Sequence, residues 1–76
     1  MKTVRRYRVL LERNDLGGYT VTVPALPAVV TQGDTRESAL ANAADAVRLY
    51  IESLRARGQT IPEDTDATLE EVAVTA

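Results

Sequence analysis

The sequence predicts a small α+β domain with the element order β-β-β-α-β. Three observations support this order: two alternating apolar runs on either side of a Gly-containing turn, one long stretch of helical period, and a short apolar run near the end. With 76 residues the chain has room for one core, so we expect a single domain over residues 1–76. We expect one mixed sheet with the long helix packed on one face and the other face open.

The first two strands are expected at residues 4–13 and 19–23. In each run the apolar residues fall on alternate positions, which places them on one face of a strand; these residues are Tyr7, Val9 and Leu11, then Tyr19, Val21 and Val23. Leu10 is the exception, because it places an apolar group on the otherwise polar face. The intervening segment 14–18 (NDLGG) is rich in residues that tolerate tight turns, so the two runs predict a β-hairpin.

The third strand is expected at residues 28–32, after an interruption by two prolines. Pro24 and Pro27 have no backbone N–H and cannot donate to a sheet ladder. The run that follows, AVVTQ, is short and β-branched, and Gly33–Asp34 then turns the chain.

The helix is expected at residues 35–57 and is the clearest element. Its apolar residues form one stripe at spacings of three and four: Leu40, Ala43, Val47, Tyr50, Ile51 and Leu54. Charged residues of both signs share the opposite face and can pair along it: Asp45, Arg48, Glu52 and Arg55. Thr35 or Asp34 is a suitable N-cap and Gly58 a suitable C′ residue. A helix of this length spans about 33 Å, so one end should project beyond the sheet.

A fourth strand is expected at residues 67–75, after a polar loop over 59–66. Its apolar residues, Leu69, Val72 and Val74, are imperfectly spaced for a strand. A right-handed crossover would return this strand parallel to the first. Glu70 and Glu71 would then lie near Arg6 and Arg8, which gives a structural reason for a basic N-terminus and an acidic C-terminus in a chain of net charge −2.

The composition excludes several classes of site. The chain has no Cys and no His, which excludes disulfides, thiol nucleophiles, Cys/His zinc sites and catalytic Ser-His or Cys-His pairs. The N-terminal residues lack the apolar run of a signal peptide, and no stretch reaches the length of a membrane span. We therefore expect a cytoplasmic protein.

Catalysis is not expected, and neither is a cofactor or a metal. Glu12, Asp34 and Glu70 could approach one another and hold magnesium, which would suit a metal-dependent nuclease. These acids are explained more simply if Glu12 occupies a surface position on a strand and Asp34 caps the start of the helix. The basic N-terminal run leaves RNA binding open, although an acidic neighbouring strand opposes a strong phosphate site.

Several short segments, taken together, resemble the HicB-like antitoxin family. They are residues 18–27 (GYTVTVPALP), 31–35 (TQGDT), 39–43 (ALANA), Tyr50, and 58–62 (GQTIP). The resemblance covers roughly residues 7–63, and its paired prolines and TQGDT turn are specific in combination. It implies a fold like a degenerate, catalytically inactive ribonuclease H core, in agreement with the element order above.

The resemblance also implies a function. Members are antitoxins that bind HicA-type toxins, which are small basic ribonucleases that cleave messenger RNA, and cover their active surface. A negatively charged antitoxin suits a basic toxin. Many members carry a C-terminal DNA-binding module; we expect none here, and no direct binding of DNA.

The residues expected to contact the toxin are Tyr19, Pro24, Leu26 and Pro27. The alternative is that both prolines only bend the chain and prevent edge pairing. A core without Phe or Trp should leave apolar surface exposed, so we expect a homodimer or tetramer through the projecting helix end or the Val23–Val30 region. The alternative function is a stand-alone domain that binds a small ligand or RNA on the open sheet face, through Arg6, Arg8 and Glu12.

Overall fold

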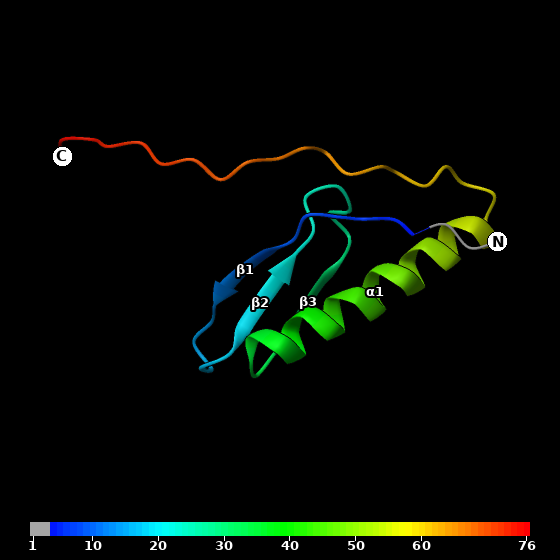
Figure 1. Ribbon diagram of the computed structural model, residues 1–76, viewed down its shortest axis with the longest axis horizontal. Coiled ribbons are helices and arrows are strands. Elements are labelled where there is room, and N and C mark those ends of the chain that lie inside the picture. The colour runs from blue at the N-terminus through cyan, green and yellow to red at the C-terminus, as the bar shows by residue number, and fades with distance from the viewer. Residues whose placement is uncertain (1–3) are drawn as a thin grey trace.

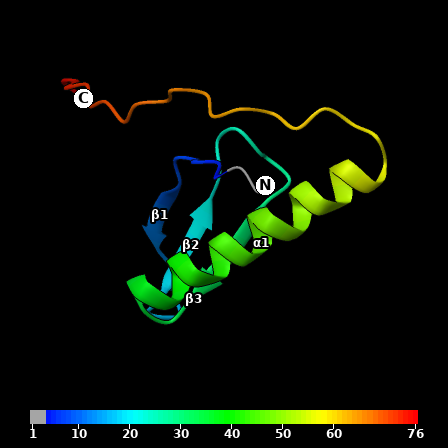
Figure 2. The ribbon, with the colours of Figure 1, turned by 45° about the vertical axis from the view of Figure 1, so that its right-hand side comes forward.

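The computed structural model describes residues 4–76 and contains three strands and one helix. The strands are β1 (Leu10–Arg13), β2 (Tyr19–Thr22) and β3 (Val30–Gly33), and the helix is α1 (Arg36–Ala56). The strands form one antiparallel sheet in the order β1-β2-β3, and α1 lies across one face of it (Figure 1). The turned view in Figure 2 shows the same two layers, helix over sheet. The predicted α+β class with a single long helix on one face is confirmed.

The β1–β2 hairpin is held by the side chain of Asn14. Its Oδ1 accepts hydrogen bonds from the backbone N–H groups of Leu16, at 3.0 Å, and Gly18, at 3.1 Å. Gly17 adopts a positive φ of 85°, which residues with a side chain rarely take. These contacts fix the register, in which Leu11 lies opposite Val21. The predicted turn at residues 14–18 is therefore confirmed.

The two prolines build a pair of consecutive tight turns between β2 and β3. The Leu26 N–H donates to the Val23 carbonyl and the Val29 N–H donates to the Leu26 carbonyl, both at 2.9 Å. Each proline thus occupies the second position of a four-residue turn, where its fixed φ is favourable. The second turn includes Ala28, so β3 begins at Val30 and not at residue 28 as predicted.

The core lies between α1 and the sheet. Its buried residues come from β2, from the proline turns and from the inner stripe of the helix: Val21, Val23, Ala25, Leu26, Val29, Ala39, Ala43, Ile51 and Leu54. Tyr7, Val47 and Tyr50 are half-buried against the Val23–Leu26 part of this core. Ala39 and Ala43 are the buried residues in the N-terminal half of the helix, so helix and sheet pack closely there.

The closest approach between the layers is at the start of α1. A Cβ added to Gly33 would collide with the backbone of Ala39 and lie 2.6 Å from the Ser38 Oγ. Further along, the Asn42 Nδ2 donates to the Gln32 carbonyl at 2.8 Å and ties the helix to β3. A glycine at position 33 is therefore required for this packing.

Both ends of α1 are capped as the sequence predicts. Thr35 is the N-cap: its hydroxyl accepts from the Ser38 N–H at 3.0 Å, and the Ser38 Oγ accepts from the Thr35 N–H at 3.0 Å. Gly58 follows the helix with a φ of 67°. On the outer face, Arg48 pairs with Asp45 and Glu52. The C-terminal half of α1 projects beyond the sheet (Figure 1).

The first strand is shorter than predicted, because its partner is short. Leu10 pairs with Thr22, and the chain of β2 enters the first proline turn one residue later. Residues 4–9 therefore have no ladder partner on β2 and run on as an extended N-terminal arm. The expected alternation still holds, since Tyr7, Val9 and Leu11 pack toward the core.

The fourth strand expected at residues 67–75 is not formed. Residues 59–76 run back past the N-terminal arm and then away from the sheet as an extended segment (Figure 1). The acids that pair with Arg8 are Asp64, at 2.9 Å, and Asp66, at 3.1 Å, in place of the expected Glu70 and Glu71. The order among the described residues is therefore β-β-β-α. The acidic C-terminal region does lie beside the basic N-terminal one, as predicted.

Candidate protein-binding surface

The face of the sheet opposite α1 is not covered by the helix. The strand register places two rows of side chains across it. One row is apolar at both edges and has a hydroxyl in the middle: Leu10, Thr22 and Val30. The other is polar: Glu12, Thr20 and Gln32. We call these six residues the open face.

Val30 is the most exposed apolar residue of this face. Its side chain is 62% exposed, on an edge strand, and Leu10 at the other edge is half-buried. Isolated exposed apolar residues are common on protein surfaces. Here, however, the apolar edges flank small threonine hydroxyls on a flat surface, so a partner can make close contact without displacing long side chains.

The proline turns adjoin the open face, because they connect Thr22 to Val30. Pro24 and Pro27 are exposed at the corners of the turns, whereas Leu26 between them is only 1% exposed and packs in the core. Of the three residues predicted here as toxin contacts, the two prolines are therefore accessible. The side chain of Leu26 is not, and the physical reason is that the paired turns direct it inward.

Tyr19, the fourth predicted contact, lies on the other face of the sheet. It is half-buried against Val21, Ala39 and Ala43, and the Arg13 guanidinium carbon stands 5.5 Å from the centre of its ring. The four predicted residues thus do not form one patch: Tyr19 faces the helix, Leu26 the core, and the two prolines the solvent.

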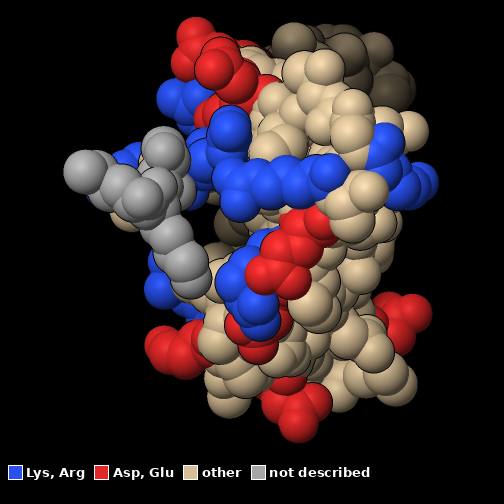
Figure 3. Space-filling view, turned by 90° about the vertical axis from the view of Figure 1, so that its right-hand side faces the viewer, with Lys and Arg blue, Asp and Glu red and all other residues tan. Residues whose placement is uncertain are grey.

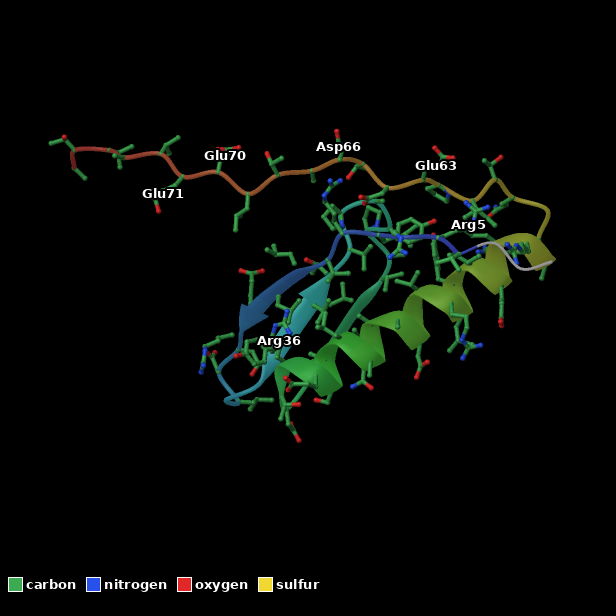
Figure 4. The ribbon with its side chains drawn as sticks, in the orientation of Figure 1. Arg5, Arg36, Glu63, Asp66, Glu70 and Glu71 are labelled. Atoms are coloured by element: carbon green, nitrogen blue, oxygen red, sulfur yellow. The ribbon has the colours of Figure 1, made fainter. Side chains whose placement is uncertain are left out.

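The acids considered for a magnesium site are not assembled. Within residues 4–76, no three Asp or Glu side chains are grouped as metal ligands would be. Glu12 lies on β1 and Asp34 in the turn before α1. Glu70 lies on the extended C-terminal segment (Figure 4), so the three acids come from separate parts of the structure.

The sequence interpretation considered the open sheet face only for a small ligand or RNA, through Arg6, Arg8 and Glu12, and did not place the toxin contact there. The apolar character of this face is indicated by Leu10, which departs from the alternation of the first strand and adds an apolar group to the outer face. Val30 gives the same signal on β3, because the register places it in the same row.

Among the described residues, no helix combines the length and the apolar character that crossing a membrane requires.

Comparison with known sequences identifies the family. The sequence model described as "HicB_like antitoxin of bacterial toxin-antitoxin system" matches residues 7–75. A UPF0150 protein of Thermoplasma acidophilum is 46% identical over 59 residues, which cover 78% of this chain and 86% of that protein. The protein named Antitoxin HicB 1 of Photorhabdus laumondii is 46% identical over 57 residues, which cover 75% of this chain and 37% of that protein.

Comparison with solved structures agrees. The crystal structure of the N-terminal domain of Burkholderia pseudomallei antitoxin HicB superposes with a TM-score of 0.69 at 32% identity, and the match covers 79% of this chain and 69% of that one. This match supports the arrangement of the helix over the sheet, and it supports a family relationship between this chain and that antitoxin. The chain belongs to the HicB-like antitoxin family of bacterial toxin–antitoxin systems.

Proposed function

We propose that this protein is an antitoxin that binds a HicA-type toxin through the open face and the adjoining prolines and thereby blocks cleavage of messenger RNA. The observation that carries the proposal is the family match over residues 7–75. The relative named Antitoxin HicB 1 supports the same role. In this proposal the protein inhibits by covering its partner and carries out no reaction of its own.

The open face is the surface we propose for this contact, because it is accessible while the other face is occupied. α1 packs against the opposite side of the sheet, through Val21, Ala39 and Ala43. Val30 and Leu10 supply apolar contact area at the two edges, and Pro24 and Pro27 extend the patch at one end. Such a patch resembles the centre of a protein interface, with few charges and rigid contact groups.

Charge supports encounter with a basic partner. The net charge is −2, and residues 59–76 hold five acids and no base: Glu63, Asp64, Asp66, Glu70 and Glu71. A basic toxin would be attracted to this region over a distance of about 8–10 Å at physiological salt. We therefore assign the acidic segment to the association rate and the open face to the stability of the complex.

An inhibition assay tests the proposal. A HicA-type toxin is titrated with the protein while RNA cleavage is followed. We expect loss of cleavage at stoichiometric protein, and at least a tenfold weaker inhibition by V30E, which places a charge on the open face. The matched control is L49E, because Leu49 is 57% exposed on the outer side of α1. No inhibition by the natural protein, or equal loss for both variants, would contradict the proposal.

RNA binding is less well supported. Arg8, one of the residues expected to line such a site, forms ion pairs with Asp64 and Asp66. Two carboxylates beside the guanidinium repel a phosphate and compete with it for the same hydrogen bonds. Filter binding at two salt concentrations separates the two functions, since an RNA site would show retention at low salt that falls steeply as salt is raised.

A further inference from the structure

The side of the core next to β1 is incompletely covered. α1 packs mainly on β3 and to a lesser extent on β2. Between the N-terminal arm and the helix lies a groove of about 750 Å³. Its floor is apolar and its rim is charged; among the described residues it is lined by Arg5, Tyr7, Val9, Leu40, Ala43, Ala44, Val47, Arg48, Ile51, Glu52 and Arg55. A strand placed beside the arm would close this groove.

The C-terminal segment, residues 67–75, is extended but pairs with no strand among the described residues. Its large apolar side chains are almost fully exposed: Leu69 at 84%, Val72 at 83% and Val74 at 81%. Because of this segment the radius of gyration is 14.6 Å, compared with about 11 Å for a compact chain of this length. An extended segment with such side chains gains stability only when it is docked against other protein.

The contacts of residues 62–66 prevent this segment from docking fully on its own chain. The Tyr7 hydroxyl donates to the Pro62 carbonyl, and Arg8 binds Asp64, so the two stretches run parallel. Continued residue by residue, the Arg8–Asp64 register places Leu69 opposite Arg13, the last residue of β1. Val72 and Val74 would then extend past the end of the strand, where their own sheet offers nothing to cover them.

Charge favours the groove of a second copy as the site for this segment. Figure 4 shows Glu70 and Glu71 on opposite sides of the extended segment, and neither forms an ion pair with a base among the described residues. The rim of the groove carries Arg5 and Arg55, for which no ion pair is found among the described residues, and Arg48, which is already paired with Asp45 and Glu52. The molecular face at the C-terminal end of α1 carries several basic side chains, with acidic side chains between and around them (Figure 3). The segment and the groove are thus complementary in both charge and apolar content.

We propose that residues 67–75 of one copy lie in the groove between the N-terminal arm and α1 of a second copy, with Val72 and Val74 on its apolar floor. The exchange is reciprocal, which gives a closed dimer with twofold symmetry and two identical contacts. Each copy supplies the groove in which the extended segment of the other copy lies. The open face stays outside this contact, and Glu63, Asp64 and Asp66 remain outside the docked segment, so the dimer and the proposed toxin complex are compatible.

The mass of the full-length protein in solution is the first test. Light scattering across a dilution series should give twice the chain mass of 8.3 kDa. The double variant V72E/V74E and the groove variant A44E should halve this mass, while circular dichroism shows that the helix is retained. L16E is the matched control, because Leu16 is 87% exposed in the hairpin turn and lies outside the groove. A monomer at every concentration, or a dimer that survives V72E/V74E, would overturn the proposal.

Engineered cysteines distinguish exchange between copies from docking on the same chain. The natural chain has no Cys, so each introduced thiol is unique. Mixed A44C and V72C variants should form a disulfide-linked heterodimer under mild oxidation, identified by its mass, and the pairing should be lost when V74E is added. In the double variant A44C/V72C, an intramolecular disulfide in a monomer would overturn the proposal. These readouts need no toxin, so they are independent of the proposed function.

Discussion

Arg8 and Asp64, 56 positions apart in the sequence, are joined by two hydrogen bonds. The Arg8 backbone N–H donates to the Asp64 Oδ1 at 3.1 Å, and the Arg8 guanidinium donates to the Oδ2 at 2.9 Å. This contact holds the N-terminal arm against the C-terminal region. It also keeps the backbone N–H of Arg8 out of any strand ladder, since a side chain already occupies it.

Removing this contact should release the C-terminal region without unfolding the domain. The Arg8 side chain is 53% exposed, so we expect D64A to lower the free energy of unfolding by only about 1 kcal/mol or less. Limited proteolysis should cut residues 59–76 faster in D64A than in the natural protein. D45A is the control, because Asp45 pairs with Arg48 on the surface of α1. Unchanged proteolysis in D64A would contradict the assigned role of the contact.

Gly33 should be far less tolerant of alanine than Gly58. At position 33 an added Cβ collides with the backbone of Ala39, so helix and sheet must separate; we expect a loss of about 1–3 kcal/mol. At position 58 nothing lies within 4 Å of the Cβ, and only the positive φ costs energy, about 1 kcal/mol. Urea denaturation of G33A and G58A measures both. A larger loss for G58A would contradict the close approach at Gly33.

The Thr35 cap should contribute measurably to stability. In T35A the Ser38 N–H loses its acceptor at the start of α1, and we expect a loss of about 1 kcal/mol. Thermal unfolding followed by the helical signal gives the comparison. T60A serves as control, since Thr60 is an exposed threonine outside the helix and outside the segment 67–75. Equal midpoints for the two variants would show that the cap is not needed.

Replacing Leu26 should destabilise the domain much more than replacing Pro24 or Pro27, because Leu26 is buried in the core and the two prolines are exposed. L26A leaves a cavity in the core, and a loss of about 2–5 kcal/mol is expected, enough to unfold much of so small a domain. P24A and P27A should retain the fold with losses near 1 kcal/mol, because they mainly make the unfolded chain more flexible. Urea midpoints for the three variants test this. Full stability of L26A would show that the turns do not bury this side chain.

The helix and the hairpin could be predicted from the sequence because their signals are local. The apolar stripe with Thr35 and Gly58 at its ends gave bounds of 35–57, against 36–56 in the structure. Likewise, Asn14 and Gly17 determine the hairpin turn by short-range hydrogen bonding and backbone freedom. Such features depend on neighbours in the chain and not on tertiary packing.

The remaining features depend on partners distant in the sequence. Residues 4–9 alternate like a strand, but β2 ends before it can pair with them. Leu26 stands between two prolines and was expected at the surface, because the direction in which two turns point a side chain is not a local property. The apolar residues at 67–75 indicate a strand, but the register set by Arg8 and Asp64 leaves most of it beyond β1.

The most direct test of the account is to map the toxin contact by NMR on the isotope-labelled protein. On addition of the HicA-like toxin, we predict that the largest changes in amide shifts occur at Leu10, Thr22 and Val30, with smaller changes on the outer side of α1 near Leu49. Changes centred on the outer side of α1, with Leu10 and Val30 unaffected, would contradict the assignment of the open face as the binding surface.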